Sequence, residues 1–236
     1  MSKPTITYTH SGDLFVIGGR DHAGKVSGDC FKLNGSKLVK IQSMARPRVS
    51  SGIFVGTDGI YMVGGCDEKF NPLPHVEKLS LTSSGGEDQW TTLPELREPC
   101  YSCSATVLNS ETLVAVGGIG EGKQSLVSIQ TLSLGKRKSQ WVKVKAVLPR
   151  PLCNAGLYQT RSNEMVIFGG WDQRPIKDVY NFVEKAGNIR VTQQQCEMEF
   201  PDIFLINWSQ IANTEVFIPG QERVHKLKTE TMEFNV

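Results

Sequence analysis

Long apolar runs, an excess of charge of one sign and an apolar leader are all missing from this sequence. No run approaches the roughly 20 consecutive apolar residues that a membrane-spanning helix needs, so we expect no membrane partner. The 26 Lys and Arg residues are nearly balanced by 24 Asp and Glu residues, and so small a surplus does not favour a nucleic acid partner. Residues 1–5 contain no signal core, and we therefore expect a cytoplasmic protein.

Cysteine, proline and glycine are also too sparse to indicate the classes of protein that depend on them. The 11 prolines and 23 glycines among 236 residues are fewer than disordered chains contain. Six cysteines are scattered through a chain long enough to form its own apolar core, whereas disulfide frameworks belong to much shorter secreted chains. We therefore expect reduced thiols, most of them buried.

One pattern returns through the whole chain, a short apolar run that ends in a glycine pair. The four complete copies are Leu14–Gly19, Ile60–Gly65, Leu113–Gly118 and Met165–Gly170, and a degenerate fifth copy is Val216–Gly220, in which Pro219 replaces the first glycine. The pairs begin 46 to 53 residues apart. Such regular spacing indicates an internal repeat rather than chance.

Each repeat contains signals for four short strands. A first strand and a turn precede the apolar run, as in Ile53–Val55 followed by Asp58-Gly59, and such turns favour hairpins. A polar loop and an alternating strand follow the glycine pair, as in Val76–Leu81, and Trp90 and Trp141 mark a fourth strand in two repeats. No segment has the helical period. The sequence therefore predicts an all-β fold of four-stranded antiparallel units.

A single four-stranded sheet has open edges and an uncovered apolar face, so the repeats must pack against one another. Radial stacking of such sheets produces a β-propeller. The glycine pairs would let backbones approach closely near the axis, and aromatic residues on the outer strands would fill the gaps between blades. We predict one domain over residues 1–236, divided into units of about 1–43, 44–96, 97–148, 149–200 and 201–236.

These features resemble the kelch repeat. The resemblance rests on the glycine pair that ends the second strand, an aromatic residue on the third, a tryptophan on the fourth, and Arg or Pro before the next first strand. It extends over the whole chain in five copies, of which the fifth is degenerate. It implies a kelch-type β-propeller of about five blades. Kelch propellers commonly have six or seven blades, so the chain is either a compact five-blade ring, which we expect, or part of a longer propeller.

Candidate binding residues come from two sets of loops that would share one face of such a propeller. In an antiparallel blade the second strand ends on the side where the first begins, so the loops after the glycine pairs lie beside the loops between blades. The first set contributes Arg20, His22, Phe70, Trp171 and Arg174, and the second set contributes Arg46, Arg48, Arg97, Tyr101 and Arg150.

Three of these arginines, Arg46, Arg97 and Arg150, precede their glycine pairs by 18, 20 and 19 residues. If they are equivalent, they would converge near the mouth of the central channel. Their guanidinium groups would suit a carboxylate or phosphate on a partner, and Tyr101 and Trp171 are residue types that anchor protein interfaces. The kelch resemblance also implies another role, in which such arginines brace neighbouring blades, and both roles stay open here.

Two motifs suggest chemistry that their surroundings do not support. Residues 117–124 nearly match a phosphate-binding P-loop, but Gln124 replaces the required Ser or Thr, and the following residues alternate like a strand. Cys100 and Cys103 form a CxxC motif without a second ligand pair. We expect them in a strand, where residues three apart point to opposite faces. The four histidines lack metal-ligand spacing, so we expect no metal and no cofactor.

The kelch resemblance implies a non-catalytic module for protein–protein interaction, an adaptor or scaffold that binds a segment of another protein on the loop face. Ubiquitin-ligase substrates, cytoskeletal proteins and scaffold proteins are the possible partners. The alternative is a kelch-like propeller enzyme of epimerase or lyase type that acts on a sugar or small metabolite. Such a site needs convergent acid, base or metal groups, whereas these loops offer mostly arginine with isolated Glu98 and Asp202. A third possibility is a structural ring within a larger assembly.

Overall fold

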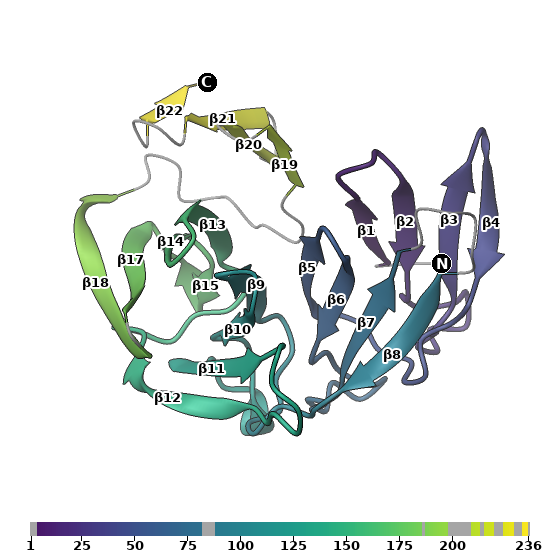
Figure 1. Ribbon diagram of the computed structural model, residues 1–236, viewed down its shortest axis with the longest axis horizontal. Helices are drawn as coiled ribbons and strands as arrows, with labels where there is room; N and C mark the ends of the chain where they lie inside the picture. Colours follow the sequence, from purple (N-terminus) through teal and green to yellow (C-terminus); the bar gives the residue numbers. More distant parts are fainter. Residues whose placement is uncertain are drawn as a thin grey trace.

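The structure is a computed structural model that describes residues 4–81, 88–185, 187–197, 209–212, 215–219, 224–228 and 233–235 (Figure 1). These residues form five four-stranded antiparallel sheets and one small hairpin. The one helical segment described is a 3₁₀ turn, η1 (Glu121–Lys123). The predicted all-β fold of four-stranded blades is therefore confirmed. The part of the chain that the structure describes holds no helix of the length and apolarity that crossing a membrane requires.

Each sheet consists of four strands in chain order. Blade 1 contains β1 (Thr5–Tyr8), β2 (Leu14–Ile17), β3 (Cys30–Asn34) and β4 (Lys37–Ile41), and blade 2 contains β5 (Gly52–Gly56), β6 (Gly59–Val63), β7 (Val76–Ser80) and β8 (Gln89–Leu93). Blade 3 contains β9 (Ser104–Leu108), β10 (Thr112–Val116), β11 (Ser128–Ser133) and β12 (Val142–Val147).

The last two sheets follow the same order with one addition. Blade 4 contains β13 (Gly156–Arg161), β14 (Glu164–Phe168), β17 (Asp178–Lys185) and β18 (Asn188–Glu197), and the fifth sheet contains β19 (Ser209–Ala212), β20 (Glu215–Pro219), β21 (Val224–Lys228) and β22 (Glu233–Asn235). A hairpin of β15 (Trp171–Asp172) and β16 (Arg174–Pro175) occupies the loop after the glycine pair of blade 4.

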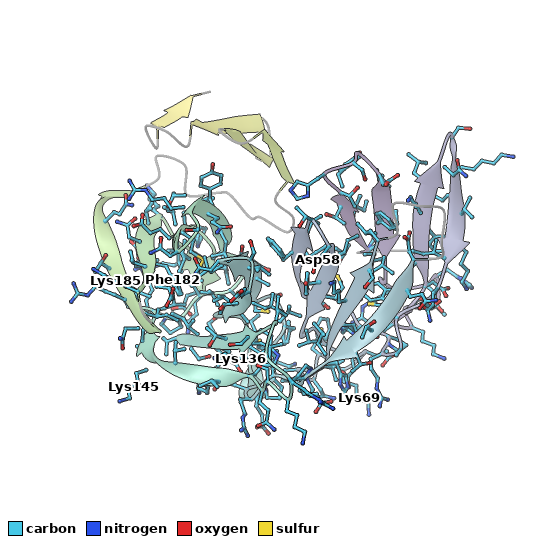
Figure 2. The ribbon with its side chains drawn as sticks, in the orientation of Figure 1. Asp58, Lys69, Lys136, Lys145, Phe182 and Lys185 are labelled. Carbon is cyan, nitrogen blue, oxygen red and sulfur yellow. The ribbon has the colours of Figure 1, made fainter. Side chains whose placement is uncertain are left out.

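The core lies between the broad faces of neighbouring blades. Phe15 and Ile17 of blade 1 pack with Met62 of blade 2, and two similar clusters join blade 2 to blade 3 and blade 3 to blade 4. In Figure 2, Phe182 lies among the side chains of the last of these clusters, whereas Lys145 on β12 points away from the sheets. Because each blade buries its apolar face only against another blade, the stability of one repeat depends on its neighbours.

Tryptophans brace blades 2 and 3 to the segment that leaves the preceding blade. Trp90 lies in β8, as predicted, and its indole Nε1 donates a hydrogen bond to the carbonyl of Gln42, 3.0 Å away. Trp141 precedes β12 by one residue and donates in the same way to the carbonyl of Pro94 at 2.8 Å. The aromatic side chains therefore close the gaps between blades, and a buried indole N–H finds its partner there.

Backbone hydrogen bonds link the blades where each first strand begins. Ser50, Ser102 and Asn154 all have φ between 52° and 55°, a left-handed conformation that is uncommon outside glycine. The Ser102 N–H donates to the Ser50 carbonyl at 2.6 Å, and the Asn154 N–H donates to the Ser102 carbonyl at 2.8 Å. The turn before each innermost strand thus joins three consecutive blades.

The glycine pairs let each second strand approach the loop between blades. At Gly64, with φ +61°, a Cβ atom would stand only 2.2 Å from the carbonyl oxygen of Cys100. At Gly117, with φ +59°, the same clash would occur with the carbonyl of Leu152. Any side chain at these positions would therefore separate one blade from the loop that leads into the next.

The expected compact five-blade ring is wrong in blade number and in closure, because the described side-chain clusters join four blades rather than five and the arc is not closed (Figure 1). Four blades pack side by side, and the first strands β5, β9 and β13 lie innermost and adjacent to one another. The open arc leaves one face of blade 1 uncovered. Its apolar residues Ile6 and Tyr8 are 47% and 56% exposed, whereas closure of a ring would bury them.

Candidate functional site

The loops after the glycine pairs and the loops between blades pair directly with each other. Short antiparallel bridges join Val49 to Cys66 in blade 2, Tyr101 to Ile119 in blade 3 and Cys153 to Trp171 in blade 4. The second member of each pair follows its glycine pair at once. Both sets of loops therefore belong to one face, which we call the loop face.

These bridges correct the supposed equivalence of the three arginines. Arg46 and Arg150 each stand three residues before their bridged residue, and the equivalent position in blade 3 is Glu98, not Arg97. The count from the glycine pair is misleading because the turn between β9 and β10 has one residue more than the turn between β5 and β6. A single inserted residue in a hairpin shifts every count made across it.

Arg97 and Arg150 also do not converge near the channel mouth, because each of these two side chains contacts its own blade. Arg97 Nη2 donates to the Gln140 side chain at 3.1 Å, just before the outermost strand of blade 3. Arg150 Nη1 donates to Asp178 Oδ2 at 3.1 Å, and this hydrogen bond raises the pKa of Arg150. The Arg46 side chain is exposed, while its carbonyl accepts a hydrogen bond from Arg48.

Arg48 is a bracing residue, because its side chain is buried beneath the loop face. Its guanidinium forms an ion pair with Glu77 on β7, and both side chains have at most 1% of their surface exposed. Glu77 Oε1 also accepts the Ala45 N–H at 2.8 Å. The ion pair therefore holds the loop between blades 1 and 2 onto the third strand of blade 2.

In blades 3 and 4, different residues hold the loop that leads into the blade onto the third strand. Gln130 pairs with Ala115 on the second strand of blade 3, just as Glu77 pairs with Met62 in blade 2. Its side chain exchanges two 2.9 Å hydrogen bonds with the backbone of Glu98. In blade 4, Asp178 accepts from the hydroxyl of Tyr180, the residue at that same position, and from Arg150. Sequence reasoning missed these residues, although a polar residue at an inward-facing position of the third strand was a visible signal.

Three candidate residues from three different loops do come together. The Arg20 guanidinium carbon lies 5.1 Å from the centroid of the Phe70 ring, and that centroid lies 6.5 Å from the centroid of the Tyr101 ring. The first distance is typical of a cation–π contact, and the second of an aromatic pair. We call Arg20, Phe70 and Tyr101 the loop cluster, which extends across blades 1 to 3.

Hydrogen bonds within the loops hold the cluster in place. Asp67 Oδ1 accepts the N–H groups of Lys69 and Asn71 at 2.8 and 2.9 Å, and hydrogen bonds from Asn71 foremost keep the pKa of Asp67 below its usual range. Phe70 has φ +63° and 43% of its surface exposed. The loop thus presents a large apolar ring to solvent in a conformation that few side chains adopt.

The remaining candidates lie apart from the loop cluster. His22 is exposed in the turn that Asp21 closes. Trp171 is half-buried in β15, where its backbone pairs with Cys153, and Arg174 is exposed in β16. Within the ranges that the structure describes, no three His, Cys, Asp or Glu side chains gather closely enough to hold a metal ion.

Comparison with known proteins identifies an architecture rather than an activity. No protein-family model and no curated protein sequence matches this chain. Among solved structures, the chain is similar to that of YjhT, with a TM-score of 0.74 and 12% sequence identity. The alignment covers 99% of this chain and 83% of that chain. The similarity shows a propeller-type fold built from four-stranded blades.

Proposed function

We propose that this chain is a kelch-type propeller that acts as a non-catalytic adaptor or scaffold, binding a segment of another protein over the loop cluster. The observation that carries the proposal is the exposed ring of Phe70, held by its loop between Arg20 and Tyr101. Aromatic residues and arginine are the residue types that supply most of the binding energy in protein interfaces. A surface that crosses three blades also suits an extended segment.

The rigidity of the loops favours binding. The Phe70 loop is closed by hydrogen bonds to Asp67, and Glu68 Oε1 accepts the Val26 N–H of the neighbouring loop at 3.2 Å. A preformed surface loses little conformational entropy when a partner binds. We infer that the partner supplies an apolar side chain for Phe70 and a carboxylate near Arg20.

A cytoplasmic location agrees with the state of the thiols. The five cysteines whose side chains the structure describes are buried, and none of them takes part in a disulfide. Reduced cysteines are the norm in the cytosol, whereas secreted proteins tend to oxidise theirs. We therefore propose cytoplasmic partners, among them ubiquitin-ligase substrates, cytoskeletal proteins and other scaffold proteins.

Affinity capture with matched variants tests this proposal. Phe70→Asn removes the ring but suits the positive φ, because asparagine tolerates that conformation better than other side chains. Val142→Asn is the control, since Val142 is a 57% exposed apolar residue on the outermost strand of blade 3. We expect the intact chain and the control to capture the same proteins, and Phe70→Asn and Arg20→Gln to lose them.

Thermal unfolding would first show that the intact chain and the three variants are folded. If all four then captured the same proteins equally, the loop cluster would not be the binding surface. The enzyme alternative has a separate readout. A sugar or metabolite that raises the melting temperature by mass action, equally in the intact chain and in Phe70→Asn, would favour a kelch-like propeller enzyme instead.

A further inference from the structure

Cys100 and Cys103 do not share a strand, contrary to the prediction. The strand β9 begins only at Ser104, and Ser102 between the two cysteines has φ 53°. A left-handed residue interrupts the alternation by which residues three apart in a strand face opposite ways. Both cysteine side chains therefore enter the same buried cluster between blades 2 and 3.

The equivalent turn of blade 2 shows the same arrangement of side chains. Arg48 precedes Ser50 by two residues and Ser51 follows it, just as Cys100 precedes Ser102 by two residues and Cys103 follows it. The Arg48 Cδ and the Ser51 Oγ both lie against Gly65, 3.0 and 2.6 Å from where its Cβ would stand. The turn thus places its first and fourth side chains on one side, over the second glycine of the pair.

The thiols of Cys100 and Cys103 interact with each other, and Cys103 Sγ also donates a hydrogen bond to the carbonyl of Val63, 3.6 Å away. A hydrogen bond between the two thiols lowers the pKa of Cys103, helped by the backbone of Gly52, and raises the pKa of Cys100. Cys103 also retains 6% of its surface exposed, whereas Cys100 retains none. Since the thiolate is the reactive form of cysteine, the lowered pKa makes Cys103 the more reactive of the two thiols.

We propose that Cys100 and Cys103 form a redox modification site, in which hydrogen peroxide converts the two thiols into an intramolecular disulfide. The Cys103 sulfur attacks one peroxide oxygen, the O–O bond breaks, and the other oxygen leaves as water, so that Cys103 becomes a sulfenic acid. The Cys100 sulfur then attacks the Cys103 sulfur, the S–O bond breaks, and a second water leaves. The two thiols lose two electrons and two protons, and one peroxide becomes two water molecules.

Other buried cysteines provide internal controls. Burial raises the pKa of Cys30 and that of Cys153 to about 11. Their thiolate forms are therefore scarce at neutral pH, and their oxidation is slow. We expect both to remain available to an alkylating reagent after a peroxide treatment that oxidises the pair.

Peptide mass spectrometry tests the proposal on the intact native chain. Trypsin cleaves after Arg97 and Lys123, so one peptide contains Cys100 and Cys103 and no other cysteine. The chain is treated with hydrogen peroxide, denatured, alkylated with iodoacetamide and digested. We expect this peptide to lack both alkyl groups and to be lighter than the dithiol by two hydrogen atoms, and dithiothreitol added before alkylation to restore both groups.

Two variants and a denatured sample make the result decisive. Cys103→Ser should leave Cys100 alkylated after peroxide, whereas Cys30→Ser should still form the disulfide. The unfolded chain, treated in the same way, shows that the oxidant is active. The proposal is overturned if the native peptide carries both alkyl groups, or if each cysteine is oxidised separately to a sulfinic acid.

Discussion

Removing Glu77 should destabilise this protein far more than removing the residue that occupies its place in the next blade. Glu77→Ala leaves the Arg48 guanidinium buried with no counter-charge, and burial already lowers the pKa of that arginine. Its Nε has no hydrogen-bond partner among the described residues, and Nη2 has only the carbonyl of Met62 at 3.4 Å. Loss of one partner of a buried ion pair costs about 3–5 kcal/mol.

Gln130→Ala is the matched control, because Gln130 braces its loop without a charge. That variant loses two hydrogen bonds to the backbone of Glu98, and leaving such buried groups unpaired costs about 1–3 kcal/mol. The difference between the two variants in the free energy of unfolding therefore measures what the unpaired charge costs. Urea unfolding followed by tryptophan fluorescence gives both values.

A double variant separates the charge from the packing. Arg48→Leu with Glu77→Gln combines the residues that blades 4 and 3 use at these positions, Leu152 and Gln130. We expect the pair of changes to cost less than the sum of the two single changes, since neither charge remains unpaired. An additive double variant, or a Glu77→Ala cost no larger than that of Gln130→Ala, would refute the bracing role of the ion pair.

Two further predictions concern the backbone and the pH dependence. Gly64→Ala should lower the free energy of unfolding by more than about 1 kcal/mol, and by more than Gly24→Ala does. Both glycines have positive φ, but only at Gly64 would the new Cβ meet a carbonyl. Equal losses for the two variants in thermal unfolding would contradict this. Burial alone would raise the pKa of Asp58, but hydrogen bonds from Lys78 and Tyr61 hold it below 3.8. Its contribution to stability is therefore present above pH 3.8 and lost as the pH falls through the lower, folded-state value. In the Lys78→Met variant, the midpoint of urea unfolding should therefore fall less steeply as the pH is lowered than it does in the intact chain.

The strands could be predicted because their signals are local. Turn residues such as Asp58-Gly59 and the alternation within each run depend on neighbours in the chain, and the structure places β5 and β6 on either side of that turn. The repeat then made the propeller-type fold the natural way to cover every blade. The strand with Trp90 was predicted for the same reason, and Trp141 missed its strand by one residue.

The candidate site was predicted less well, because its geometry depends on contacts between distant residues. Counting along the chain made Arg97 the counterpart of Arg46, and one additional turn residue before β10 made that count wrong. Arg48 was predicted to face a partner, whereas its ion pair with Glu77, 29 residues further along, buries it. Composition does not show which of two neighbouring arginines turns inward.

The sequence by itself determined the repeat, the four strands of each unit and the close approach at the glycine pairs, since short-range sterics and hydrogen bonding decide those features. Only the tertiary structure decided which loops meet, as in the contact of Arg20 with Phe70 and Tyr101, and that the arc of blades stays open. It also decided that Cys100 and Cys103 turn to one side. These outcomes depend on how one blade packs against the next, which no single repeat contains.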